Sequence, residues 1–208
     1  MNIYTILLLS LFILVGCSDS KLTKNIDEVN LTQYLPNNID KIGSENTGDT
    51  FKDMVTILYN ENVNNYIKEL GLLDKSEDDA IQRVHDFITC KQFYKEDNKS
   101  GYYTQHDTYK PGVKYISRYI KDGYGDCEDQ AMFAFSILTN IGIDVKILEY
   151  KTNNIGHIAL EVNDKLFDPY KEKCGTSVGN YKETQYNKKI VYSEFDIVIE
   201  KIKLFIGL

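Results

Sequence analysis

The side chains best suited to chemistry begin with Cys127, at the predicted start of a helix. The segment Gly125-Asp126-Cys127-Glu128-Asp129 follows Gly123, and the two glycines allow the backbone to turn sharply. Asp126 is a favourable N-cap residue, and Asp129 stands three residues later, as in a carboxylate form of the capping box. Apolar residues then recur at helical spacing, at Ala131, Ala134, Phe135 and Leu138. Because a helix start favours an anion, we interpret Cys127 as a nucleophilic thiolate; the alternative is a buried structural cysteine.

A histidine and an aspartate occupy a predicted β-hairpin farther along the chain. Residues 156–162 alternate apolar side chains as a strand does, and Asn163-Asp164 predicts the turn into the next strand. With the turn centred on that dipeptide, Ala159 lies opposite Asp168. His157 is then the diagonal neighbour of Asp168, about 7–8 Å away at the backbone. The hairpin therefore predicts a His–carboxylate pair, and the alternatives are a satisfied polar histidine and an aspartate that ends a strand.

Helices are predicted ahead of the Cys127 helix. The apolar spacing over residues 51–70 fits one broken helix or two short ones. Ser76, with the acids that follow, is a capping signal for a helix whose buried face includes His85, which we interpret as structural. Pro111 suits the start of a short amphipathic helix that continues over residues 113–120.

A polar, tyrosine-rich loop at residues 91–110 precedes the Cys127 segment, and loops of this length are often functional. Its candidates for lining a substrate cleft are Tyr102, Tyr103, Gln105, His106 and Tyr109. A solvated surface loop is the alternative.

Strands are predicted after the Cys127 helix, which Gly142 ends. We expect a strand over residues 145–149, then the hairpin, a polar loop over 171–189 and a further strand over 190–192. The residues from Ser193 onward fit either a capped helix or a strand.

The N-terminus has the pattern of an exported lipoprotein. Residues 1–16 are apolar and uncharged, too short for a comfortable membrane span and typical of a signal-peptide core. Leu14-Val15-Gly16-Cys17 resembles the bacterial lipobox, which predicts lipid modification of Cys17 and anchoring on the periplasmic or cell-surface face of a membrane. An uncleaved membrane anchor is the alternative. Residues 17–50 are polar and predict a tether, with ordered pieces around residues 31–35, so that residues 51–208 form one domain.

Composition excludes several classes of function. The chain has 208 residues, 42% of them hydrophobic, and a net charge of −7 without basic blocks. The hydrophobic content supports a sizeable core, and the acidic balance argues against nucleic acid as a partner. No glycine-rich phosphate loop and no Cys/His zinc spacing is present, so we expect no cofactor. Asp126, Glu128 and Asp129 are candidate calcium ligands, although we favour capping of the helix as their role.

Together these motifs resemble those of the transglutaminase-like superfamily. The residues that carry the resemblance are Gly125-Asp126-Cys127-Glu128-Asp129, Gly142-Ile143, Gly156-His157 and Asp168-Pro169. The Gly-Asp-Cys-Glu-Asp form is especially similar to the bacterial transglutaminase-like cysteine peptidases, and the matching region runs from about Ser76 to Tyr170.

The resemblance implies an α+β, papain-like fold, with N-terminal helices and the Cys helix packed on an antiparallel sheet. It also implies Cys127 as nucleophile, His157 as base and Asp168 as the residue that orients His157. The chain departs from the pattern at Ala159, where many members have an aromatic residue, and it has no tryptophan.

The implied reaction is acyl transfer at an amide bond of a protein or peptide, through a thioester on Cys127. The backbone N–H of Cys127 is the natural first oxyanion donor, and Gln105 and Tyr124 are candidates for the second. Hydrolysis is the default because water is abundant. The alternatives are a transamidase that cross-links proteins and a non-catalytic module that binds a surface partner.

Whether the remaining cysteines form a disulfide depends on the predicted export. Exposed thiols in an oxidising compartment tend to pair. With Cys17 lipidated and Cys127 free as nucleophile, Cys90–Cys174 is the compatible internal bridge. The alternative is that Cys90 and Cys174 stay unpaired, because sequence alone does not show their proximity.

Overall fold

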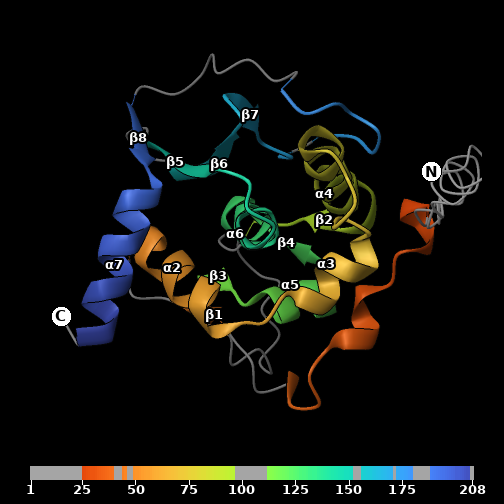
Figure 1. Cartoon of the computed structure of the whole chain (residues 1–208), viewed down its shortest axis with the longest axis horizontal. Helices are drawn as coiled ribbons and strands as arrows, with labels where there is room; N and C mark the ends of the chain where they lie inside the picture. Colours follow the sequence, from red (N-terminus) through yellow and green to blue (C-terminus); the bar gives the residue numbers. More distant parts are fainter. Residues whose placement is uncertain are drawn as a thin grey trace, which may run out of the picture.

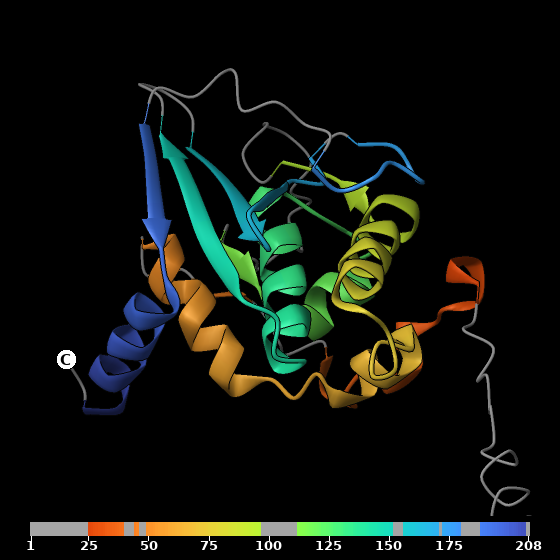
Figure 2. The ribbon, with the colours of Figure 1, turned by 45° about the horizontal axis from the view of Figure 1, so that its top comes forward.

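The computed structural model describes residues 25–39, 44–45, 49–96, 112–151, 156–170, 172–179 and 188–206. Helices precede an antiparallel sheet along the chain, in agreement with the predicted α+β class. Helix α6 (Cys127–Asn140) lies at the centre, with the sheet on one side and α4 (Glu77–Lys91) on the other (Figure 1, Figure 2). Because α6 lies between the sheet and α4, its first turn, which carries Cys127, lies between these two layers.

Residues 51–70, for which the apolar spacing predicts one broken helix or two short ones, belong to two helices. These are α2 (Thr50–Asn60) and α3 (Asn64–Leu70). Gly71, with φ 66°, ends α3 in the left-handed conformation that glycine adopts without strain. The two helices bury apolar faces in the core, through Met54, Val55, Ile57, Tyr66, Ile67 and Leu70.

The capping signal before α4 is confirmed. The Ser76 hydroxyl accepts the backbone N–H of Asp79 at 3.2 Å. His85 is 1% exposed, so its predicted position on the buried face of this helix is also confirmed.

Helix α6 is buried along most of its length. Asp126 and Asp129 form the predicted reciprocal capping box at its start. Residues 131–138 are each at most 2% exposed, and Gly142, with φ 85°, follows the end of the helix. A helix that is apolar all around must be covered on every side, which is why the sheet and the other helices pack around α6.

In the described part of the chain, the largest sheet has four antiparallel strands in the order β7-β6-β5-β8. The strands are β5 (Val145–Lys151), β6 (Gly156–Val162), β7 (Lys165–Phe167) and β8 (Lys188–Tyr192). Asn163 and Asp164, with φ 50° and 57°, form the tight turn between β6 and β7. Leu160 pairs with Phe167. Extending this register by one residue puts Ala159 opposite Asp168, as predicted.

The segment before α6 differs from the prediction. Residues 113–114 form β3 (Val113–Lys114), which pairs with β1 (Ser44–Glu45), and α5 (Ile116–Asp122) begins only after it. The backbone N–H of Lys114 donates to Asp129 Oδ1 at 2.7 Å, so α6 holds this segment extended. A second short pair joins β2 (Phe93–Tyr94) to β4 (Tyr124–Gly125) in parallel.

The C-terminal segment is a helix, α7 (Glu194–Ile206), which resolves the helix-or-strand alternative. The backbone N–H and the hydroxyl of Ser193 donate to Asp196 Oδ2 at 2.8 and 2.7 Å. This local capping favours helix over a strand with the same apolar residues.

Part of the predicted tether lies against the domain. Two short 3-10 helices, η1 (Ile26–Glu28) and η2 (Leu31–Tyr34), are present, the second where an ordered piece was expected. Leu31 is 2% exposed, and Lys91 Nζ donates to the carbonyl of Asp27 at 2.8 Å.

Several predictions concern residues outside the described ranges: the signal peptide at 1–16, Cys17, and the cleft candidates Tyr102, Tyr103, Gln105, His106 and Tyr109. Across the described residues, none of the helices combines the length and the apolar character that crossing a membrane would require.

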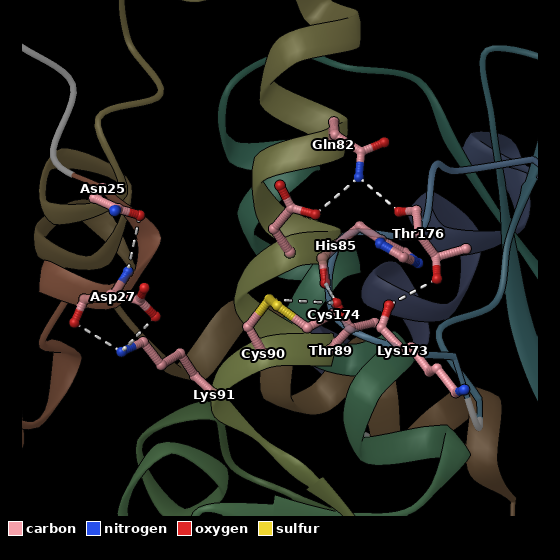
Figure 3. Close-up of a disulfide and its surroundings, with 11 residues drawn as sticks. Asn25, Asp27, Gln82, His85, Thr89, Cys90, Lys91, Lys173, Cys174 and Thr176 are labelled. Atoms are coloured by element: carbon pink, nitrogen blue, oxygen red, sulfur yellow. Dashed lines mark hydrogen bonds and ion pairs between the residues drawn. A yellow bond between two sulfur atoms is a disulfide. The ribbon is translucent and has the colours of Figure 1, made fainter.

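Cys90 and Cys174 form a disulfide, with their Cα atoms 4.6 Å apart. The bridge joins the last turn of α4 to residues 172–179, the segment after the hairpin (Figure 3). Of the three cysteines that the structure describes, Cys127 is the one outside a disulfide. The pairing that the sequence left open is thus formed.

Removing this disulfide is expected to lower the free energy of unfolding by about 2–5 kcal/mol, because the bridge restricts a long loop in the unfolded chain. The measurement is urea denaturation of the Cys90→Ser/Cys174→Ser double variant beside the oxidised wild type. Wild type kept reduced by dithiothreitol should match the double variant. Equal denaturation midpoints for the oxidised and bridge-free forms would contradict the prediction.

Candidate active site

The turn before Cys127 needs its two glycines for different reasons. Gly123 has φ 72°, so the predicted sharp bend is confirmed there. At Gly125, by contrast, a Cβ atom would lie 2.6 Å from Asp129 Cβ and 2.8 Å from Tyr119 Cδ2. Gly125 therefore permits a close approach between the turn and the first turn of α6, which holds Cys127 at the helix start.

Replacing Gly125 with alanine is expected to destabilise the fold by about 1–3 kcal/mol, because the added methyl group overpacks a buried contact. Chemical denaturation measures the change. The matched control is Gly156→Ala, where a Cβ would meet no atom within 4 Å and stability should stay within about 0.5 kcal/mol of wild type. Equal stability of the two variants would refute the close-approach argument.

His157 and Asp168 are in direct contact across the hairpin, as the strand register predicts. His157 Nε2 lies 2.8 Å from Asp168 Oδ2, and both side chains are buried. The other oxygen, Asp168 Oδ1, accepts the backbone N–H of Tyr170 at 3.2 Å. The carboxylate is thus held at both oxygens, and it fixes the orientation of the imidazole.

Cys127 meets the same strand one residue farther on. It is 9% exposed, and its thiol accepts a hydrogen bond from the backbone N–H of Ile158. Since Ile158 follows His157, the structure brings the start of α6 beside the start of β6. The three residues predicted to act together therefore lie in one region.

Three tyrosines surround this region. The Tyr170 and Tyr150 rings lie 5.3 and 6.2 Å from the His157 ring, centroid to centroid. Tyr94 packs edge-on against Tyr170 at 4.6 Å, and its backbone pairs with Gly125. Burial, and after it the neighbouring Cys127 and Asp126, hold the pKa of Tyr94 well above its usual range, so Tyr94 remains a hydroxyl donor.

Sequence reasoning did not single out these tyrosines. Tyr94 stands in the loop that was marked as tyrosine-rich, and Tyr170 stands two residues after Asp168. For Tyr170, its nearness in sequence to Asp168 is the signal that could have identified it, whereas no local signal points to Tyr94 or Tyr150.

The surroundings of Cys127 oppose a thiolate. Burial raises the pKa of the Cys127 thiol well above its usual value, and the charges of Glu128 and Asp126 raise it further. The Cys127 thiol donates to Glu128 Oε2 at 3.2 Å, whereas the hydrogen bond from Ile158 acts in the opposite direction. Ionisation of Cys127 therefore depends on a neighbouring cation, and His157 is the side chain able to become one.

The acidic residues around Cys127 do not form a metal cluster. Asp129 Oδ1 accepts the Lys114 backbone N–H, and its Oδ2 lies 3.7 Å from Lys114 Nζ and 3.4 Å from the Asp126 N–H. Glu128 faces the thiol instead. Within the described residues, no group of three or more His, Cys, Asp or Glu side chains could hold a metal ion. Asp129 and Glu128 thus already contact protein groups, and the buried ammonium of Lys114 supplies the positive charge beside Asp129.

The side chain of Tyr124, an oxyanion candidate, lies among cations. Lys114 Nζ and Lys95 Nζ lie 4.0 and 4.2 Å from the centre of its ring. The backbone carbonyl of Tyr124 accepts a hydrogen bond from Lys114 Nζ at 2.9 Å. Gln105, the other candidate, lies outside the described residues.

No family model matches the chain, and no curated protein matches it. Among solved structures, Legionella pneumophila LapG aligns over 70% of this chain and 88% of its own, with 16% identity and a TM-score of 0.44. The calcium-bound form of LapG aligns over 71% and 89% of the two chains, with 15% identity and a TM-score of 0.43. The EGTA-treated form aligns over 70% and 86%, with 17% identity and a TM-score of 0.42. Similarity at this level extends to the general course of the chain and carries no argument about activity.

Proposed function

We propose that this protein is a cysteine-dependent hydrolase of amide bonds in a protein or peptide, with Cys127, His157 and Asp168 as its catalytic residues. The observation that carries the proposal is the 2.8 Å contact between His157 Nε2 and Asp168 Oδ2. The next residue, Ile158, gives its backbone N–H to the Cys127 thiol. A thiol, an imidazole and a carboxylate in this order are the groups that nucleophilic acyl transfer requires.

Each residue has a defined task in this reaction. Because His157 Nε2 faces Asp168, proton exchange with Cys127 falls to Nδ1. The thiolate attacks the carbonyl carbon, and the His157 imidazolium gives its proton to the leaving amine as the C–N bond breaks. A water molecule, deprotonated by His157, then attacks the thioester, and the acid and the free thiol are released.

The oxyanion of the tetrahedral intermediate needs donors. The backbone N–H of Cys127 lies at the start of α6, where helix N–H groups have no intrahelical acceptor. We add Tyr94 to Tyr124 and Gln105 as candidates for the second donor, because Tyr94 pairs with Gly125 and remains protonated.

One incubation separates the three functional classes. Surface proteins and a glutamine-containing protein are supplied with a small primary amine, and products are mapped by mass spectrometry. New free N-termini are expected, because water is the abundant acceptor. Stable incorporation of the amine would assign a transamidase instead. The absence of both products would favour a binding module.

We also propose that the protein is exported and anchored through a lipid on Cys17. The Cys90–Cys174 disulfide supports export, since such bridges persist in oxidising compartments. The proposal of a lipid anchor rests on the sequence Leu14-Val15-Gly16-Cys17. Cys17→Ser should release the protein from membranes or leave an unprocessed precursor. Processing and localisation like those of wild type would reject the lipid anchor.

We propose further that the reaction needs no bound calcium. The support is the set of contacts that already engage Asp129 and Glu128. Addition of EGTA is expected to leave the thermal unfolding midpoint and the alkylation rate of Cys127 unchanged. A fall in either on chelation, reversed by calcium, would contradict this expectation.

A further inference from the structure

A second histidine–carboxylate pair adjoins the first. His85 Nε2 lies 2.6 Å from Glu172 Oε2, and the two side chains are 1% and 10% exposed. The His85 ring also stands edge-on to Phe167, at 5.5 Å between centroids. The backbone N–H of Glu172 donates to the carbonyl of Pro169 at 3.1 Å. Pro169 directly follows Asp168, so a tight turn joins Glu172 to the residue whose carboxylate contacts His157.

The segment that carries Glu172 is fastened to α4 independently of His85. Gln82 binds it twice: Nε2 donates to the carbonyl of Thr176 at 2.9 Å, and Oε1 accepts the N–H of Val178 at 3.1 Å. The disulfide to Cys174 adds a covalent link, and Figure 3 shows Gln82 and the disulfide on the same side of α4. Glu172 is therefore held in place even when its contact with His85 changes.

The pair changes its charge near neutral pH. Burial, and next the negative charge of Asp168, raise the pKa of Glu172 to about 7. Burial lowers the pKa of His85, against the opposing charges of Asp86 and Asp168. The two charges that act on the pair belong to Asp86, on α4, and to Asp168, at the end of the hairpin. As the pH rises through about 7, the pair releases one proton and becomes negative.

We propose that Glu172 and His85 are positioning residues for the His157–Asp168 pair, and that they set the amount of negative charge that faces His157 and so the reactivity of Cys127. The inference rests on the proposed function. While Glu172 is protonated, Asp168 alone stabilises the His157 imidazolium. Once Glu172 is ionised, a second carboxylate stabilises the imidazolium as well, and the thiolate–imidazolium form of the site becomes more populated.

The test is the rate of Cys127 alkylation by iodoacetamide between pH 5 and 9, followed on the Cys127 peptide by mass spectrometry. Wild type is expected to show an inflection near pH 7, the pH at which Glu172 ionises. Glu172→Gln should lose this inflection and react about three- to tenfold more slowly than wild type above it, since one pKa unit corresponds to tenfold. His85→Leu should move the inflection to higher pH, because the Glu172 carboxylate loses its hydrogen-bond donor.

Gln82→Ala is the matched control, because it loosens the same segment and changes no charge. It should keep the inflection. Loss of the inflection in Gln82→Ala as well as in Glu172→Gln would overturn the proposal in favour of a purely structural role, as would a Glu172→Gln profile that superimposes on wild type.

Two further measurements keep the outcomes separate. If His157→Ala alkylates as fast as wild type, the proposed function fails, whatever Glu172 does. NMR titration of the histidine rings, of which the chain has three, provides a direct readout in the folded protein. A step near pH 7 at the His157 ring that disappears in Glu172→Gln supports the proposal, and its persistence overturns it.

Discussion

Replacement of Cys127 by alanine is expected to reduce amide-bond hydrolysis and labelling by a thiol-directed electrophile to background. The variant lacks the atom that forms the thioester, and loss of a nucleophile of this kind costs on the order of 10⁶-fold in kcat. The measurement is incubation of the full chain with an activity-based electrophile and with surface proteins, beside wild type.

The fold should survive the change, since the Cys127 side chain is small and the start of α6 is capped by Asp126 and Asp129. Thermal unfolding and an intact Cys90–Cys174 bridge provide the control. Full activity in Cys127→Ala would mean that the protein does not work through this thiol.

Asp168→Asn is expected to reduce kcat by about 10⁴-fold while leaving the structure in place. The amide keeps the shape of the carboxylate, and its oxygen can still accept the N–H of Tyr170. However, it presents no negative charge to His157 Nε2, so it neither fixes the required tautomer nor stabilises the imidazolium. Steady-state hydrolysis of a substrate identified with wild type measures the loss.

Glu161→Gln is the matched control for this variant. It makes the same acid-to-amide change on β6, at a side chain that pairs with Lys146 at 2.7 Å instead of with His157. Its kcat should stay within about twofold of wild type, because its ion pair is partly exposed and worth little. Comparable losses in both variants would show that net charge, and not the contact with His157, determines the rate.

The parts of the site that local rules govern could be predicted from sequence. The capping box of Asp126 and Asp129 depends on a three-residue spacing, and the hairpin register follows from a two-residue turn at Asn163. Together these placed Cys127 at a helix start and His157 diagonal to Asp168. The helices before Cys127 and the strands after it followed in the same way from helical spacing and strand alternation, whereas the α+β class as a whole was implied by the resemblance.

The parts that depend on distant segments could not be predicted. Tyr94 reaches the site because its strand pairs with Gly125, and Glu172 meets His85 across 87 positions of sequence. Lys114 has the composition of a surface residue, yet its side chain is 3% exposed and lies 3.4 Å from Asp122. For Tyr94 and Glu172 the partner lies far outside the window that periodicity or capping can examine, and for Lys114 the contact joins β3 to the end of α5, which neither signal reports.

The position of the disulfide also determines how the molecule responds to a cut in its backbone. Cys90 precedes the Cys127 segment and Cys174 follows Asp168, so the bridge closes a covalent ring that contains all three proposed catalytic residues. Cleavage of any one peptide bond between Cys90 and Cys174 opens the ring but leaves the two pieces joined. Such a nicked molecule would run as one species on a non-reducing gel and as two after reduction, and none of its catalytic residues would be lost by diffusion.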